Sequence, residues 1–589
     1  MDAQINNQDA LRFSWRVIAL LIFLATIIWL PRSVGLDRFV TTDEVIWLLR
    51  SGNFYYALGQ RDFAGTLRNK TPGVVTMWVE TIAYLQEFPL YRGLGQGFFE
   101  KYAKFEALLE SHGVDPHQIL TRSRALTVLL NSLVIGLGAL FAWRLFGLPA
   151  TLVGFLLIAF EPYHIAVTRL AHLDGPLSSF LFLSVLAYLA YLYNGRRWLS
   201  LLVSATSGGL AVLAKLPGFM IIPTVGLIHI VDFLYSLGNR GETPSAFLRN
   251  TLNKLLKPLL LWGLVFAITI IIFLPAFWVS PIKGPVDLFL TPLIFTQRGT
   301  SSGLGDEEIA NETRPDHTFS VQELEEAVRY PISYLWRATP VTLLGLLAAL
   351  IGYVRRYGIL AHERLRKSLV GLFIFVLVYT VFLSIPEKSS AKYYLPIYPT
   401  LDLVAGAGWV AFTSWLFRLP FLPRSRFAPA VILIFVLGIQ AVSSLSNYPY
   451  YFTYFSPLMG GSQRANQVMG LGSGEGLDQA AFYLNQKPNA EKLKVLSWYG
   501  IGPFSYFFKG ETYLFEVGTN IWTANDITEL KEMDYLVIYN NQWRRGTPAG
   551  LFPYLSGLEP EHSVWIKGIE YARIYNVHTF PPEKFDTPN

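Results

Sequence analysis

Long apolar runs recur along the chain and alternate with short polar segments. A helix needs about 20 mostly apolar residues to cross a bilayer, so this pattern predicts about eleven membrane spans. The predicted spans lie near residues 14–34, 122–146, 148–168, 175–194, 198–215, 217–236, 258–278, 338–355, 368–386, 393–416 and 428–446. The expected fold is therefore mostly α-helical and polytopic.

Basic residues concentrate in every second short loop, a bias typical of the cytoplasmic side of a membrane. The residues concerned are Arg144, Arg196, Arg197, Arg240, Arg249, Lys254, Lys257, Arg355, Arg356, Arg364, Arg366, Lys367, Arg418, Arg424 and Arg426. This pattern predicts a cytoplasmic N-terminus and an extracytoplasmic C-terminus. Three long segments then lie outside: residues 35–121, 279–337 and 447–589.

The first outer loop has its own helical patterns. Val74 to Phe88 is apolar and aromatic but too short to span, so it predicts a helix lying in the interface. Residues 98–110 show the spacing of a second amphipathic helix. Ahead of both, we expect Asp43 and Glu44 to lie in an extended or irregular segment, where adjacent side chains point in different directions.

The tail after residue 446 has the shorter periods of a soluble fold. Its predicted elements are a helix over 475–486, a buried strand over 494–499, a helix over 527–533, a buried strand over 535–539 and a hairpin over 562–577. The chain therefore divides into a membrane domain, residues 1–446, and a small extracytoplasmic α/β domain, residues 447–589.

Composition agrees with a membrane protein, since 52% of the 589 residues are hydrophobic and 15% are aromatic. The formal charge of +6 is explained by the basic loops and does not indicate a nucleic-acid partner. The chain has no cysteine, which excludes disulfides and thiolate metal sites. The first apolar run lacks a small-residue cleavage site, so it predicts a retained span in the plasma (inner) membrane.

Four polar clusters fall on the predicted outer side. They are Asp43 with Glu44; Arg169, His172 and Asp174 between the third and fourth spans; Lys70 with Lys215; and Lys388, Lys392 and Tyr393 between the ninth and tenth spans. Each cluster alone also fits a structural interpretation, because basic side chains reach from helix ends toward the interface and Asp174 could cap a helix. Together they bring carboxylates and phosphate-binding cations to one side of one membrane.

That combination suits the transfer of a sugar from a lipid phosphate. The phosphate is the leaving group, and fixed cations can stabilise its negative charge. A carboxylate can take the proton from the acceptor hydroxyl on the opposite face of the sugar. Cations alone would suit any anionic lipid, whereas the added carboxylates favour group transfer.

The order of these motifs resembles a known group of enzymes. The motifs are Asp43-Glu44 after the first span, Arg169-x-x-His172-x-Asp174, Leu213-Ala-Lys215-Leu-Pro217 and Lys392-Tyr-Tyr-Leu-Pro-x-Tyr-Pro399. In this order, residues 1–446 resemble the C-type polytopic glycosyltransferase superfold. The pattern is most similar to bacterial members of the protein O-mannosyltransferase and lipid A aminoarabinose transferase group.

The resemblance implies an inverting transferase that uses a polyprenyl-phosphate-linked sugar. Asp43 would be the general base, Glu44 would orient acceptor or sugar, and Asp174 would be a second acidic residue in the same cavity. The residues implied to bind the donor phosphate or lipid are Lys70, Arg169, His172, Lys215, Lys388, Lys392 and Tyr393. Lys70 departs from the group's pattern, because Thr71-Pro72-Gly73 follows it in place of two prolines.

Alternatives remain open at this point. A transporter or lipid flippase is the main one, although no inverted repeat is visible in the sequence. A surface anchoring protein with a working tail is another. The acceptor could be a lipid, a glycan or a protein, and no spacing demands a metal, so a divalent cation has no support in the sequence. Glu161 and Asp402 lie within predicted spans and are functional candidates for that reason.

Overall fold

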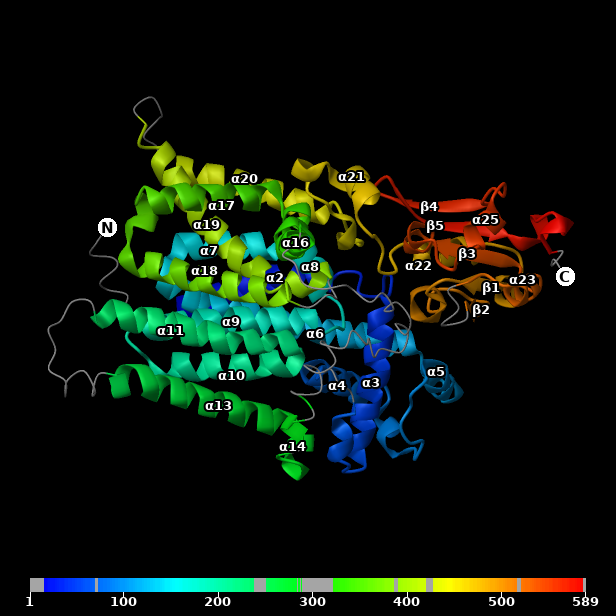
Figure 1. The fold of residues 1–589 in the computed structure, drawn as a ribbon, viewed down its shortest axis with the longest axis horizontal. Coiled ribbons are helices and arrows are strands. Elements are labelled where there is room, and N and C mark those ends of the chain that lie inside the picture. The colour runs from blue at the N-terminus through cyan, green and yellow to red at the C-terminus, as the bar shows by residue number, and fades with distance from the viewer. Residues whose placement is uncertain are drawn as a thin grey trace.

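The computed structural model describes residues 15–68, 72–237, 251–282, 284–286, 288, 321–385, 390–419, 427–515 and 521–585. A bundle of long helices occupies one part of the molecule, and a small sheet domain lies at one end of it (Figure 1). Three helices of the predicted first outer loop lie at the same end (Figure 1). The predicted combination of a helical bundle with a small C-terminal α/β region is confirmed, and the boundary at residue 446 stays a prediction.

Each predicted span coincides with a helix or a bent helix pair. The helices are α2 (Trp15–Ser33), α6 (Pro116–Phe146), α7 (Leu148–Ala159) with α8 (Pro162–Thr168), α9 (Asp174–Tyr193), α10 (Trp198–Ala214), α11 (Ile221–Leu237), α13 (Lys257–Phe273), α17 (Pro340–Val354), α18 (Glu363–Leu383), α19 (Ile397–Leu416) and α20 (Ala428–Leu445). Within the described residues, six helices are long and apolar enough to cross a membrane, or up to seven with the bent pair. The predicted mostly α-helical, polytopic fold is confirmed.

Helix α9 is the centre of the bundle. Its apolar stretch is completely buried, whereas that of α20 is mostly exposed at the periphery. A helix that is apolar all round is expected in such a central position. Small residues allow close helix contacts around it: a Cβ on Gly406 of α19 would lie 2.4 Å from the backbone nitrogen of Gly154 on α7.

The bend between α7 and α8 begins at Glu161 and Pro162. The two helices meet at 64°, and Pro162 is the first residue of α8, where its missing N–H is not needed. The bend leads the chain into the short connection that carries Arg169, His172 and Asp174.

The predicted first outer loop contains three helices, α3 (Thr42–Gly59), α4 (Val74–Glu87) and α5 (Tyr102–Ser111). Helices α4 and α5 match the two predicted helices, but the extended segment expected around Asp43 and Glu44 is wrong. Thr41 precedes the first turn of α3, and the Glu44 carboxylate accepts hydrogen bonds from the Thr41 backbone N–H at 3.1 Å and hydroxyl at 2.9 Å. This is the pattern of a capping box, so a local signal for helix initiation was present in the sequence.

The remaining helices lie between helices of the bundle or within the tail. They are α14 (Ala276–Val279), α16 (Val321–Arg337), α21 (Gly461–Val468), α22 (Leu477–Leu484), α23 (Ala524–Leu530), α24 (Asn540–Arg545) and α25 (Leu551–Leu555). Helix α16 falls at the end of the predicted second outer loop. Its last residue, Arg337, donates to the backbone carbonyls of Phe452 and Tyr454 and so fixes the start of the tail to the bundle.

The tail forms a five-stranded mixed sheet in the order β2-β1-β3-β5-β4. The strands are β1 (Lys494–Ser497), β2 (Glu511–Leu514), β3 (Tyr535–Tyr539), β4 (His562–Ile566) and β5 (Ile569–Asn576). Strands β1, β2 and β3 are parallel, and β4 and β5 form an antiparallel hairpin. The predicted strands and hairpin are confirmed, whereas the short, half-buried edge strand β2 was not predicted.

Candidate active site

Asp43 and Lys392 form an ion pair at one end of the bundle. The Lys392 ammonium Nζ lies 2.5 Å from Asp43 Oδ2, although the two residues are 349 positions apart in the sequence. Asp43 is in the first turn of α3, and Lys392 lies in the short 3-10 turn Ala391–Tyr394 that precedes α19. The Asp43 side chain keeps 41% of its surface exposed, so the carboxylate remains accessible.

A second ion pair joins Asp174 and Lys215. Lys215 Nζ lies 2.7 Å from Asp174 Oδ1, and the Asp174 side chain is completely buried. Asp174 begins α9, and Lys215 follows the last residue of α10. The Lys215 ammonium also lies 4.0 Å from the ring centroid of Tyr393, a cation–π contact.

His172 lies between the two pairs. Its Nε2 atom is 3.5 Å from Asp43 Oδ2, and its Nδ1 atom is 3.0 Å from Asp174 Oδ2. Five polar side chains therefore follow one another in space, in the order Lys392, Asp43, His172, Asp174 and Lys215. We call these five residues the charged cluster.

Asp43 and Lys392 each stabilise the charged form of the other. Burial alone would raise the pKa of the Asp43 carboxyl, but the Lys392 charge and the His172 imidazole together hold that pKa well below its ordinary value. Burial alone would lower the pKa of the Lys392 ammonium, but the Asp43 carboxylate raises it above its ordinary value. Asp43 and Lys392 are therefore both charged across the physiological pH range. The stability that Asp43 adds is lost only as the pH falls below its ordinary pKa of about 3.9.

Glu44 faces away from the charged cluster and binds Arg124 of α6. Arg124 Nη2 lies 2.6 Å from Glu44 Oε2, and Arg124 Nε donates to Glu44 Oε1 at 2.7 Å. The Glu44 carboxylate also accepts the Ala171 backbone N–H at 3.0 Å. All these contacts are to the protein, so Glu44 holds α3, α6 and the connection before α9 together and thereby positions Asp43.

Arg124 was not singled out in the sequence. It lies inside a predicted span, and an ionisable residue in a span is a functional candidate by default, so a signal was available. Besides Glu44, it donates to the backbone carbonyls of Leu36, Arg38 and Phe39 at 2.6–3.0 Å. Arg124 therefore also fixes the chain that leads into α3.

Arg169 lies outside the charged cluster. Its Nη2 atom donates to the carbonyls of Val34 at 2.5 Å and Gly35 at 2.7 Å, and its guanidinium lies 5.4 Å from the ring centroid of Tyr451. These contacts join the end of α2 to the tail. A role for Arg169 in binding donor phosphate stays a prediction.

The other candidates lie elsewhere. Lys70 and Lys388 fall outside the described residues. Glu161 Oε2 accepts a hydrogen bond from Gln440 at 3.2 Å, and Asp402 Oδ1 accepts one from Thr342 at 2.8 Å, within a separate buried polar network. Among the described residues, no group of three or more His, Asp or Glu side chains has an arrangement that could hold a metal ion.

Comparison with known proteins bears on this arrangement. A family model described as dolichyl-phosphate-mannose-protein mannosyltransferase matches residues 14–282. The amino-terminal part of the chain resembles this family. The match includes Asp43, Arg169, His172, Asp174 and Lys215, and it confirms the predicted resemblance to the protein O-mannosyltransferase group. No curated protein matches the sequence.

Two solved structures are similar to this chain at low sequence identity. ArnT from Cupriavidus metallidurans in the apo state is 14% identical, with a TM-score of 0.45 over 96% of this chain and 99% of that chain. The protein O-mannosyltransferase Pmt1-Pmt2 complex of S. cerevisiae, bound to the sugar donor, is 19% identical, with a TM-score of 0.35 over 46% of this chain and 36% of that chain.

Proposed function

We propose that this protein is an inverting membrane glycosyltransferase. It moves a sugar from a polyprenyl-phosphate donor to an acceptor hydroxyl on the outer face of the plasma (inner) membrane, with Asp43 as general base. The observation that carries the proposal is the charged cluster, in which an accessible carboxylate lies beside Lys392 and a second lysine, Lys215, belongs to the same cluster. The matched family, whose description names a dolichyl-phosphate mannose donor, supports this donor class.

The reaction needs one proton acceptor and one stabilised leaving group. Asp43 takes the proton of the acceptor hydroxyl, and the hydroxyl oxygen forms a bond to the anomeric carbon from the face opposite the phosphate. The bond from that carbon to the phosphate oxygen breaks, and the electron pair leaves with the polyprenyl phosphate. This opposite-face attack inverts the anomeric centre, and Lys392 and Lys215 stabilise the negative charge of the leaving phosphate.

Lys392 links the basicity of Asp43 to binding of the donor. While Lys392 contacts Asp43, the carboxylate is charged but weakly basic, because its pKa is held low. A donor phosphate attracts the same ammonium, and any lengthening of the Lys392–Asp43 contact raises the basicity of Asp43. The base is therefore strongest when the donor is bound, which limits reaction in its absence.

His172 and Asp174 complete the site. Asp174 lies close to both Lys215 and His172, so it positions one phosphate-binding cation and the imidazole beside Asp43. The ring face of Tyr393 contacts the Lys215 ammonium and helps to hold it in the cluster. We retain Lys70 and Lys388 as further donor-phosphate ligands on the strength of their sequence motifs alone.

Replacement of Asp43 tests the proposal. Asp43→Asn keeps the shape of the side chain and removes its basicity, so transfer should fall by about 10²–10⁴-fold while the protein still folds. The assay is release of polyprenyl phosphate by protein in nanodiscs, with polyprenyl-phosphate mannose and polyprenyl-phosphate aminoarabinose as donors and a membrane extract as acceptor. Polyprenyl-phosphate binding should survive the substitution.

Asp62→Asn is the matched control, because Asp62 is an exposed residue of the same predicted outer loop whose side chain accepts the Gly65 N–H at 2.9 Å. It should keep the parent rate. If the Asp43→Asn protein transferred sugar at the parent rate, Asp43 would not be the general base. If the parent protein moved the lipid across the membrane and left its sugar–phosphate bond intact, the protein would be a flippase instead.

A further inference from the structure

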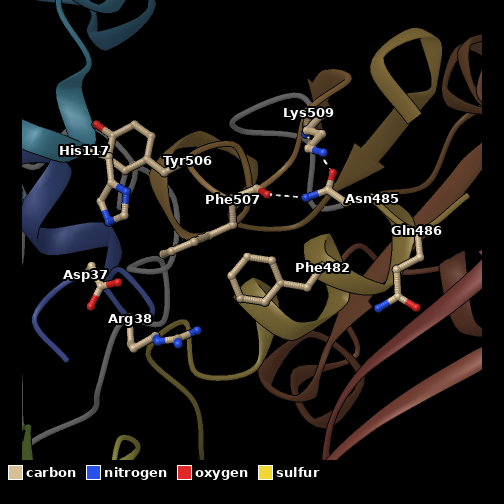
Figure 2. Close-up of a pocket in the computed structure, with 9 residues that line it drawn as sticks. All are labelled: Asp37, Arg38, His117, Phe482, Asn485, Gln486, Tyr506, Phe507 and Lys509. Carbon is tan, nitrogen blue, oxygen red and sulfur yellow. Dashed lines mark hydrogen bonds between the residues drawn. The ribbon is translucent and has the colours of Figure 1, made fainter. Parts of the chain in front are cut away.

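A cavity of about 550 Å³ lies where the C-terminal domain meets the membrane domain. Nine residues line it (Figure 2). Asp37 and Arg38 come from the chain ahead of α3, and His117 comes from the first turn of α6. The C-terminal domain supplies Phe482, Asn485, Gln486, Tyr506, Phe507 and Lys509.

Aromatic rings form one wall of this cavity. The His117 imidazole is stacked on Tyr506 with ring centroids 5.6 Å apart, and it meets Phe507 edge-on at 5.0 Å. Phe482 packs edge-on against Phe507 at 5.8 Å and keeps 38% of its surface exposed. His117 Nε2 is buried and has no hydrogen-bond partner within the described part of the chain, so one polar atom at this wall remains available.

Polar side chains of both charges surround the rings. Asp37 and Arg38 are exposed on one side, and Gln486 and Lys509 are exposed on the other. Asn485 is already engaged: it donates to the Phe507 carbonyl at 2.7 Å and accepts the Lys509 backbone N–H at 2.9 Å (Figure 2). Because these bonds fix the segment that carries Phe507 and Lys509, the cavity has its shape before any ligand binds.

The cavity is structurally tied to the charged cluster. Arg124 binds the carbonyls of Leu36, Arg38 and Phe39 and also binds the Glu44 carboxylate beside Asp43. Arg38 and Asp43 are five positions apart in the sequence, and an extended chain of that length spans at most about 18 Å. A ligand held in the cavity could therefore reach Asp43 with its far end.

We propose that this cavity binds the carbohydrate part of the acceptor. The C–H face of a sugar ring is attracted to the negative face of an aromatic ring, which Phe482 offers. The hydroxyl groups of a sugar both donate and accept hydrogen bonds, so they suit the Asp37 carboxylate, the Arg38 guanidinium and the Gln486 amide. The mixed charges favour a neutral ligand over an anionic one.

None of the nine lining residues belongs to a strand, so a peptide could not add to a sheet edge here. The acceptor role rests on the proposed function, whereas carbohydrate binding does not.

Saturation-transfer NMR on the full chain in nanodiscs tests binding without any turnover. The probes are three neutral trisaccharides, namely mannotriose, cellotriose and chitotriose. At least one should receive saturation on its ring protons, and Phe482→Ala should weaken that signal by about fivefold or more through loss of ring contact. Trp565→Ala is the matched control, because Trp565 is an aromatic residue 60% exposed on β4 and outside the cavity. It should keep the signal.

Each other outcome overturns the proposal. These outcomes are no saturation of any trisaccharide, an unchanged signal in a folded Phe482→Ala/Gln486→Ala variant, and an equal loss in Trp565→Ala. The test also separates the cavity from the reaction. If Asp43→Asn abolishes transfer while no trisaccharide binds, the cavity assignment alone fails. If a trisaccharide binds through Phe482 while Asp43→Asn transfers sugar at the parent rate, the proposed mechanism alone fails.

Discussion

At the scale of single residues, Asp43 and Glu44 show how neighbouring carboxylates acquire different roles. Successive side chains of an α-helix point about 100° apart, so the first turn of α3 directs them to different partners. Glu44 is completely buried against Arg124, whereas Asp43 remains accessible beside Lys392 and His172. Of the two carboxylates, only that of Asp43 is accessible.

Lys392 should control the pH dependence of the reaction. Its charge lowers the pKa of Asp43, so Lys392→Met should raise that pKa, and the acidic limb of kcat/KM should move by about 1–3 units toward higher pH. The measurement is kcat/KM for the lipid donor between pH 3 and pH 8. Lys392→Arg keeps the charge and should leave the limb near its original position. An acidic limb unmoved in Lys392→Met would show that Asp43 is not the titrating base.

At the scale of elements, the contact between α3 and α6 depends on one buried ion pair. Arg124 is 3% exposed and Glu44 is completely buried, so neither charge has water to replace a lost partner. The same arginine holds the carbonyls ahead of α3. This one side chain therefore helps to fix the position of α3, and with it that of Asp43.

Arg124→Met should therefore destabilise the protein by about 3–5 kcal/mol, because it leaves the buried Glu44 charge unpaired. The double variant Arg124→Met/Glu44→Gln should recover part of that loss. Thermal unfolding of purified protein in detergent is the measurement.

Arg122→Met is the control from the same helix. Arg122 is 52% exposed and pairs with Glu87 at 2.8 Å, so its loss should cost less than about 1 kcal/mol. Equal stability of the Arg124→Met and Arg122→Met proteins would refute the importance of the buried pair.

At the scale of the whole molecule, the C-terminal domain packs directly on the segment that carries Asp43. A Cβ on Gly474 would lie 2.2 Å from the Val40 carbonyl oxygen, and one on Gly502 would lie 2.2 Å from Val45 Cγ2. The Tyr450 hydroxyl donates to Asp478 Oδ2 at 2.7 Å near the same junction. The domain thus supports the N-terminal end of α3, which argues against a tail that works independently of the membrane domain.

Gly474→Ala should separate this junction and lower sugar transfer by at least about tenfold, because a misplaced catalytic group costs rate steeply. Its control is Gly568→Ala in the β4–β5 turn, where φ is also positive, at +77°, but no atom lies within 4 Å of the added Cβ. Both variants carry the same kind of backbone strain, and only Gly474→Ala meets a backbone oxygen. Similar transfer rates for the two would contradict a role of the junction in placing Asp43.

The orientation of the chain is open to a direct test. The protein has no cysteine, so single cysteines at exposed positions report their side of the membrane without background. Ser556→Cys, in the C-terminal domain, should react with an impermeant maleimide in intact cells. Arg355→Cys, in a basic loop, should react only after permeabilisation. The reverse pattern would place the charged cluster on the cytoplasmic side.

The sequence alone determined the helical bundle, the presence of a small C-terminal α/β domain and most elements of the tail. Hydropathy and periodicity are local properties, so each predicted span and each predicted strand could be located without knowing its partners. The topology of those spans also brought the acidic and basic candidates to one side. The capping pattern at Thr41 and Glu44 shows that even α3 had a local signal.

Only the tertiary structure decided which of these charges meet. Lys392 could have faced either aspartate or neither, and Arg169, which lies close to His172 in the sequence, binds backbone carbonyls away from the cluster. The cavity between the domains likewise combines residues of the loop before α3, of α6 and of the tail. Such contacts depend on how helices and domains pack over long sequence separations, and side chains of the same type and local pattern acquire different partners from that packing.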